Sequence, residues 1–210
     1  MDRAVALIDY GAGNLHSVEN ALRHVGAEVE VTADPDAVTR ADRIVLPGVG
    51  AFAACAAGLR ALPGMIEAMD GRVRKGGVPF LGVCVGMQLL ASRGREHGEH
   101  DGLGWIPGEV VRIEPDEANV RVPHMGWNDV RAARTGSGQA HRVLEPGEAY
   151  FLHSYHFRAA DPADVLATTL HGGDLVAAVG RDTILGVQFH PEKSQAYGLS
   201  LLRRFLDWNP

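Results

Sequence analysis

Short apolar runs alternate with helix-like segments through the first ninety residues. The run Ala4–Ile8 leads into the glycine turn "GAGN" and then into apolar residues three or four positions apart, which are Leu15, Val18, Leu22 and Val25. A continuous apolar run followed by a 3.6-residue period predicts a buried strand, a turn and a helix that ends near Gly26. The chain therefore opens with a strand–turn–helix unit.

Similar units continue up to residue 90. The runs "EVEVT" and "RIVLPGVGAF" predict a second and a third strand, and the third continues into a glycine loop and an alanine-rich helix. A helical stripe formed by Met65, Ile66, Met69 and Val73 then precedes a fourth buried strand, "VPFLGVC". Strands that alternate with helices indicate a parallel sheet covered on both faces.

The pattern changes after about Trp105. Short strand-like runs follow without helices between them: "GEVVRIE", "NVRVPHMGW", "EAYFLHSYHFR", "DVLATTL", "LVAAVGR" and "ILGVQFH". We expect an antiparallel or mixed extension of the same sheet, and then a closing helix with Leu199, Leu202, Phe205 and Leu206 on one face. The predicted fold is α/β: a three-layer, open, twisted and mostly parallel sheet with helices on both faces and an antiparallel extension, in a single domain spanning residues 1–210.

Composition narrows the class of protein. The chain has 210 residues, of which 46% are hydrophobic and 22% charged, and its formal net charge is −6. This is enough apolar material for a sizeable core. Nucleic-acid binding requires clustered Lys and Arg, and no such run occurs, so we expect no nucleic-acid partner. A small metabolite, even an anionic one, remains a possible ligand.

Two cysteines and the apolar runs bear on location. Cys55 and Cys84 are far apart and form neither a CxxC pair nor a disulfide framework, which suits a reducing compartment. The apolar stretch at the N-terminus is too short for a signal-peptide core, and the longest near-apolar run, residues 78–91, contains Gln88 and two glycines. We expect a cytoplasmic protein that does not insert into a membrane.

Cys84 stands in a frame typical of a nucleophile. "Gly82-Val83-Cys84-Val85-Gly86" has the form of a nucleophile elbow, a sharp strand-to-helix turn in which the two glycines relieve crowding. The turn lies at the carboxyl end of a predicted parallel strand, where ligands bind, and near a helix N-terminus, which favours thiolate. The alternative is a small buried hydrophobic residue, and that is our interpretation of Cys55, which has no such frame.

A cysteine nucleophile needs a partner that moves protons. His190 in "GVQFHPEKS" ends a strand-like run, and Glu192 lies two residues on, where its carboxylate can orient the imidazole. Taken alone, a His-Pro-Glu tripeptide is more often a structural turn. The cluster "HGEHD", residues 97–101, lacks the spacing of a metal site and is interpreted as a solvated loop, so we expect no metal and no cofactor.

Taken together, "PFLGVCVGMQLL", "GVQFHPEKS" and "LPGVGAF" resemble the class I glutamine amidotransferase family. The resemblance implies that Cys84 is the nucleophile, His190 the general acid/base and Glu192 its orienting carboxylate. It further implies an oxyanion hole formed by Val85 and by the "PGVG" loop with Val49 and Gly50. The residues that it implies for binding L-glutamine are Gln88, Ser154 and Tyr155. The family usually has Leu where this chain has Val85, but the donor there is a backbone N–H.

Three further stretches are similar to family members that act as one subunit of a synthase: "LIDYGAGNLHSVENAL", "VPHMGWN" and "YFLHSYHF". This similarity implies a heterodimer with a (β/α)₈-barrel cyclase subunit, which receives ammonia, and partner-facing positions for Asn14 and Lys193. We also hypothesise that the second oxyanion donor, in the "PGVG" loop, points away until the partner signals. The alternatives are another amidotransferase or cysteine hydrolase on this fold, and a non-catalytic regulatory subunit.

Overall fold

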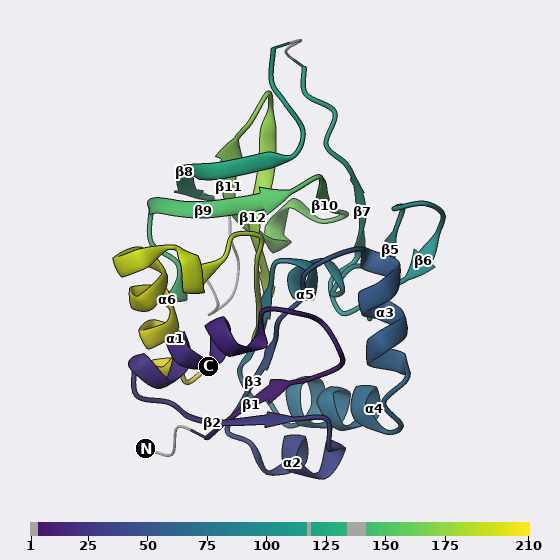
Figure 1. Ribbon diagram of the computed structural model, residues 1–210, viewed down its shortest axis with the longest axis vertical. Coiled ribbons are helices and arrows are strands. Elements are labelled where there is room, and N and C mark those ends of the chain that lie inside the picture. Colours follow the sequence, from purple (N-terminus) through teal and green to yellow (C-terminus); the bar gives the residue numbers. More distant parts are fainter. Residues whose placement is uncertain (1–3, 117–118, 134–141) are drawn as a thin grey trace.

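The computed structural model describes residues 4–116, 119–133 and 142–210. Its larger sheet has nine strands in the order β2-β1-β3-β4-β13-β12-β11-β8-β9, and the first five of these run parallel (Figure 1). The parallel strands are β1 (Ala4–Ile8), β2 (Glu28–Thr32), β3 (Arg43–Leu46), β4 (Phe80–Val83) and β13 (Ile184–Val187). Because the strand order reverses between β1 and β3, the carboxyl ends of these strands border a crevice.

The remaining strands of this sheet are antiparallel. They are β12 (Asp174–Arg181), β11 (Val165–Leu170), β8 (His124–Ala132) and β9 (Gly147–His153). The predicted fold class, with its parallel sheet and antiparallel extension, is confirmed. The run "ILGVQFH" gives β13, which pairs parallel to β4 and so makes the sheet a mixed one, as the prediction allowed.

A second, smaller sheet has the order β10-β7-β5-β6. Its strands are β10 (Tyr155–Ala159), β7 (Gly108–Arg112), β5 (Arg93–Gly94) and β6 (His100–Asp101). The run "EAYFLHSYHFR", which resembled one strand, is broken by a bend at Ser154, so that β9 and β10 enter different sheets. Sequence period alone could not place this break, since both halves are strand-like.

Helices cover the two faces of the parallel sheet (Figure 1). One face carries α1 (Leu15–His24) and α6 (Gln195–Asp207), which contact each other. The other carries α2 (Pro35–Arg40), α3 (Phe52–Arg60), α4 (Met65–Asp70) with its π-helical continuation η1 (Gly71–Lys75), and the single turn α5 (Val85–Gln88). The described residues also contain the 3₁₀ turns η3 (Pro162–Asp164) and η4 (Pro191–Lys193).

The apolar stripes seen in the sequence face the core. In α1, Val18 and Leu22 are buried, and in α6 Leu202, Phe205 and Leu206 are buried. Helix α2 had no counterpart in the prediction, because six residues are too few for a periodic pattern. The start of this helix is determined by Asp34, whose side chain accepts a hydrogen bond from the backbone N–H of Asp36 at 2.9 Å and so caps the helix.

Within the described ranges, no single helix is long and apolar enough to cross a membrane. Two helical segments separated by a 92° bend, Phe52–Arg60 and Met65–Lys75, reach the required length and composition only when they are taken together.

Candidate active site

Cys84 stands on a tight elbow between β4 and α5. Its backbone has φ 53° and ψ −111°, a strained conformation for a residue with a side chain. A Cβ atom on Gly82 would lie 2.7 Å from the carbonyl oxygen of Gly86, and one on Gly86 would overlap the carbonyl oxygen of Leu46. Both glycines are therefore required sterically. A titratable side chain lies next to the sulfur.

That neighbour is His190, whose imidazole contacts the Cys84 side chain on one side and Glu192 on the other. His190 Nδ1 lies 2.8 Å from Glu192 Oε1, and both side chains are almost fully buried. The backbone of His190 is held twice: its N–H donates to the carbonyl of Tyr150 at 2.9 Å, and its carbonyl accepts the hydroxyl of Ser194 at 2.6 Å. The imidazole thus has a fixed position.

Electrostatics favour a charged imidazole at this position. Burial alone would lower the pKa of His190, but contacts with Cys84 and Glu192 outweigh it and raise the pKa to about 9. Burial alone would raise the pKa of Glu192. The hydrogen bond and positive charge of His190, together with the hydrogen bond from the Asn14 amide, outweigh burial and lower this pKa. Asn14 Nδ2 donates to Glu192 Oε1 at 2.6 Å. The arrangement is a buried Cys–His–carboxylate row held from behind by Asn14.

A cavity of about 280 Å³ opens in front of the sulfur. Cys84 is only 4% exposed, but it borders this cavity. Its lining includes nearly all residues singled out from the sequence: Val49, Gly50, Cys84, Val85, Gln88, Ser154, Tyr155, His190 and Lys193. Glu192 and Asn14 are the two that do not line it, because they lie behind the imidazole.

Gln88 holds the far wall of the cavity. Its Nε2 donates to the carbonyl of Tyr155 and to Oε1 of Gln188, each at 3.0 Å. Both hydrogens of the amide are then used, so Gln88 can offer a ligand only its oxygen. Gln188 Nε2 in turn lies 3.6 Å from the Cys84 sulfur. Gln188 was missed from the sequence, since its position in "GVQFHPEKS" carries no signal beyond the strand pattern.

The "PGVG" loop, residues 47–50, lies directly over the elbow. The backbone N–H of Val85 donates to the carbonyl oxygen of Gly48 at 3.2 Å. A Cβ atom on Gly48 would lie 2.7 Å from the backbone nitrogen of Gly86, so only glycine allows this approach. In this conformation a loop carbonyl, and not a ligand oxygen, occupies the Val85 donor.

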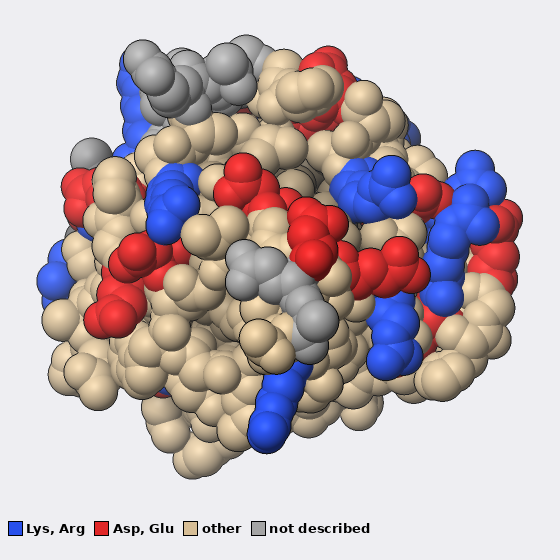
Figure 2. Space-filling view, turned by 90° about the horizontal axis from the view of Figure 1, so that it is seen from above, with Lys and Arg blue, Asp and Glu red and all other residues tan. Residues whose placement is uncertain are grey.

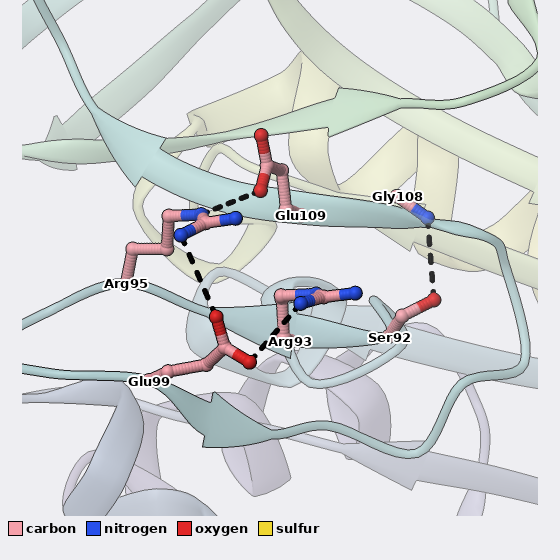
Figure 3. Close-up of polar contacts among 6 residues, drawn as sticks. All are labelled: Ser92, Arg93, Arg95, Glu99, Gly108 and Glu109. Atoms are coloured by element: carbon pink, nitrogen blue, oxygen red, sulfur yellow. Dashed lines mark hydrogen bonds and ion pairs between the residues drawn. The ribbon is translucent and has the colours of Figure 1, made fainter.

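A carboxylate that sequence analysis missed also borders the cavity. Glu96 Oε2 accepts the backbone N–H of Phe52 at 2.7 Å and so caps α3, whose own N-cap residue, Ala51, supplies no side-chain bond. The segment that carries Glu96 is fixed on the small sheet. Figure 3 shows Arg95 between Glu109 and Glu99, at 2.6 and 3.5 Å. These pairs are exposed to solvent and each is weak, but together they fix the direction of the segment.

Beneath the cavity, two histidines share a hydrogen bond. His124 Nδ1 lies 2.9 Å from His153 Nε2, and His153 Nδ1 lies 2.9 Å from the carbonyl of Tyr155. Since a carbonyl only accepts, His153 carries its hydrogen on Nδ1, and His124 must then donate from its own Nδ1. Asn128 Nδ2 completes the row by donating to His124 Nε2 at 3.0 Å. Both rings are therefore neutral.

Among the described residues, no group of three or more His, Cys, Asp or Glu side chains is arranged to hold a metal ion. His97, from the "HGEHD" stretch, is exposed. The chemistry available at this site is that of a nucleophile, an acid/base and backbone donors.

A family model for class-I glutamine amidotransferases matches residues 6–208. The chain belongs to this family. The predicted resemblance is thereby confirmed, and the glycine frame around Cys84 is an element of a glutamine amidotransferase.

Individual relatives within the family are similar to nearly the whole of this chain. The chain is 59% identical to the imidazole glycerol phosphate synthase subunit HisH of Zymomonas mobilis, with 98% of this chain and 96% of that protein covered. It is 53% identical to the subunit of the same name from Ruegeria pomeroyi, with 98% and 99% covered.

Solved structures support the fold of this amidotransferase. A crystal structure of a glutamine amidotransferase superposes with a TM-score of 0.73 at 23% identity, covering 97% of each chain. A chain of PurLQS from Thermotoga maritima superposes with a TM-score of 0.67 at 15% identity, covering 98% of each. At these identities the likeness concerns the fold alone.

Proposed function

We propose that this protein is the glutaminase subunit of imidazole glycerol phosphate synthase. It hydrolyses L-glutamine to glutamate and ammonia and passes the ammonia to a cyclase subunit. The cyclase makes imidazole glycerol phosphate and aminoimidazole carboxamide ribonucleotide in histidine biosynthesis. The main support is the high identity over nearly full length to subunits of that name, together with a His190 imidazole placed between Cys84 and Glu192.

In the proposed reaction the Cys84 thiolate attacks the side-chain amide carbon of glutamine. The tetrahedral oxyanion is held by backbone N–H groups, and the His190 imidazolium gives its proton to the departing nitrogen, which leaves as ammonia. Water then loses a proton to the neutral imidazole and attacks the γ-glutamyl thioester. Glutamate leaves, and the thiolate and imidazolium are restored. Glu192 keeps the imidazole in one orientation throughout.

Glu96 suits the amino-acid end of the substrate. It is a carboxylate at the wall of the cavity, and the α-ammonium of glutamine is the cation that it can pair with. The turn at Ser154 and Tyr155 borders the same cavity and offers backbone groups for the α-carboxylate. In this proposal Gln88 supports that turn through the Tyr155 carbonyl.

The loop conformation supports low activity without a partner. With the Gly48 carbonyl on the Val85 N–H, neither the Val85 N–H nor the Val49 N–H is available to an oxyanion. Turning the Gly48–Val49 peptide over would free the Val85 N–H and aim the Val49 N–H into the cavity. Loss of one oxyanion donor typically costs about 3 to 4 kcal/mol, a rate factor of about 10² to 10³. The partner-bound enzyme is therefore the fast one.

An exposed apolar surface beside the cavity fits the cyclase subunit. On the outer face of the β8–β9 pair, Met125 is 66% exposed, Trp127 44% and Leu152 39%. Met125 stands opposite Leu152 in the strand register, and Leu152 also borders the cavity. Lys193 lies 6.0 Å from the centre of the Tyr150 ring at the same rim. A partner docked here would cover the mouth and receive ammonia before bulk water protonates it.

Charge on the molecule is mixed. Figure 2 shows the molecule from above, with acidic and basic side chains interspersed and a large uncharged area.

Both cysteines in the described part of the chain are free thiols, which supports our proposal of a cytoplasmic location.

The test is Cys84→Ala in the complex with the cyclase subunit. We expect glutamine-dependent synthesis to fall at least a thousandfold, while synthesis from added ammonium salts stays within twofold of wild type. Glu192→Gln should be milder, because it disturbs the orientation of the imidazole without removing the base. Loss of the ammonia-dependent reaction in Cys84→Ala would show a structural role for Cys84 and contradict the proposal.

A further inference from the structure

Two buried side chains lie behind the "PGVG" loop, outside the cavity. Tyr10, which follows β1, donates its hydroxyl hydrogen to the carbonyl of Pro47 at 2.6 Å. Cys55, on α3, donates its thiol hydrogen to the carbonyl of Val49 at 3.4 Å. The two side chains also interact with each other. Neither takes part in the reaction as described above, yet together they bind the loop at both ends.

The carbonyl between these two anchors points the other way. Gly48 sends its carbonyl to the Val85 N–H at 3.2 Å, whereas the carbonyls before and after it, of Pro47 and Val49, face Tyr10 and Cys55. Turning one peptide unit over changes ψ of the first residue and φ of the second and leaves the neighbouring carbonyls in place. The Gly48–Val49 peptide can therefore turn while both anchors stay bonded.

Packing leaves the anchors little freedom. A Cβ atom on Gly48 would lie 2.8 Å from Tyr10 Oη and 2.9 Å from Val85 Cβ, so the loop is pressed between Tyr10 and the elbow. On the other side, a Cβ atom on Gly58 of α3 would lie 2.5 Å from the Tyr10 carbonyl oxygen. Tyr10 is thus wedged between the loop and α3.

Both anchors keep the hydrogen that they donate. Burial raises the pKa of the Tyr10 phenol far above neutral pH, and the neighbouring Cys55 raises it further. Burial also raises the pKa of the Cys55 thiol. The two hydrogen bonds to the loop are therefore present throughout the pH range in which a glutaminase is assayed.

We propose that Tyr10 and Cys55 are positioning residues that fix the two ends of the oxyanion loop, so that activation turns over the Gly48–Val49 peptide alone. The inference rests on the proposed function, because it concerns the same loop and the same reaction. Its consequence is kinetic. Without an anchor the loop still turns, but the Val49 N–H no longer stops at the position of the oxyanion, so transition-state stabilisation falls while glutamine binding does not.

The experiment measures glutamine hydrolysis by the complex with and without the nucleotide substrate of the cyclase. For Tyr10→Phe we expect the stimulated kcat to fall about tenfold, with KM for glutamine and the unstimulated rate within twofold of wild type. Cys55→Ala should lower the stimulated kcat three- to fivefold, since a thiol is a weak donor, and Cys55→Ser should recover most of the loss. Tyr197→Phe is the matched control: its hydroxyl donates to the carbonyl of Glu145 at 2.7 Å, away from the loop.

Ammonia-dependent synthesis by the same complexes reports whether each variant still folds and docks, and it should be unchanged in all four variants. A Tyr10→Phe complex with wild-type stimulated kcat, or one whose defect lies in KM or in the ammonia-dependent reaction, would overturn the anchoring role. If the wild-type complex itself hydrolysed no glutamine, the proposed function would fail, and the anchoring role that rests on it would fail with it.

Discussion

The hydrogen bond between two buried histidines should make this protein sensitive to acid. His124 is 3% exposed and His153 7%, and the 2.9 Å gap between their nitrogens holds one hydrogen. A second proton on His153 would place an N–H at Nε2 against the N–H at Nδ1 of His124. A second proton on His124 would place an N–H at Nε2 against the amide N–H of Asn128. Burial lowers the pKa of His124 to about 4 and that of His153 to about 3, and the stacked ring of His171 adds to the effect.

The sign and size follow from proton linkage. An unfolded histidine has a pKa near 6.5, so below that pH the unfolded chain binds a proton that the folded chain refuses, and stability falls. For His124, with a folded pKa of about 4, lowering the pH from 7.5 to 5.5 costs on the order of 1 kcal/mol, roughly a factor of ten in the unfolding equilibrium. His190 acts in the opposite sense, because its raised pKa of about 9 gives stability that is lost as the pH rises toward 9.

The assay is urea unfolding of wild type and His124→Gln at pH 7.5 and 5.5, followed by the fluorescence of the buried Trp105 and Trp208. Subtracting the two pH dependences cancels the contribution of His190 and leaves that of His124. We expect the free energy of unfolding of the variant to fall by on the order of 1 kcal/mol less than that of wild type over this interval. His24→Gln, at the exposed end of α1, should lose as much as wild type. Equal pH dependence in wild type and His124→Gln would refute the reasoning.

Three further substitutions test the site and its surroundings. Glu96→Gln keeps an acceptor for α3 but removes the charge proposed to pair with the α-ammonium of glutamine, so steady-state kinetics should show KM raised about 10- to 100-fold with kcat little changed; a fall in kcat alone would contradict this role. Gly86→Ala should destabilise the protein by more than about 3 kcal/mol in urea unfolding, because its Cβ would overlap the Leu46 carbonyl, whereas Gly71→Ala, with nothing within 4 Å, should be neutral or stabilising. Trp127→Ala should weaken titrated binding of the cyclase subunit about 10- to 100-fold without loss of stability, and equal weakening by Val31→Ala, on the distant strand β2, would argue against a specific docking surface.

The sequence by itself determined most of the sheet and the position of the elbow that carries the candidate nucleophile, Cys84. Apolar runs and helical stripes located the parallel strands and their helices, since burial imposes those periods locally. The frame Gly82 to Gly86 predicted the elbow at Cys84, because the steric limits of a tight turn act within five residues. His190 and Glu192 were found for a similar reason: they are two residues apart on one short turn.

Only the tertiary structure decided how these parts act on one another. The Gly48 carbonyl on the Val85 N–H, the Tyr10 hydroxyl on Pro47 and the Asn14 amide on Glu192 each join segments at least 37 positions apart. Asn14 illustrates the difference: its partner-facing position stays a prediction from the sequence, whereas only the fold shows that its amide donates to the buried carboxylate of Glu192. Contacts of this kind depend on how strands and helices stack, and no local periodicity records which side chains that stacking brings together.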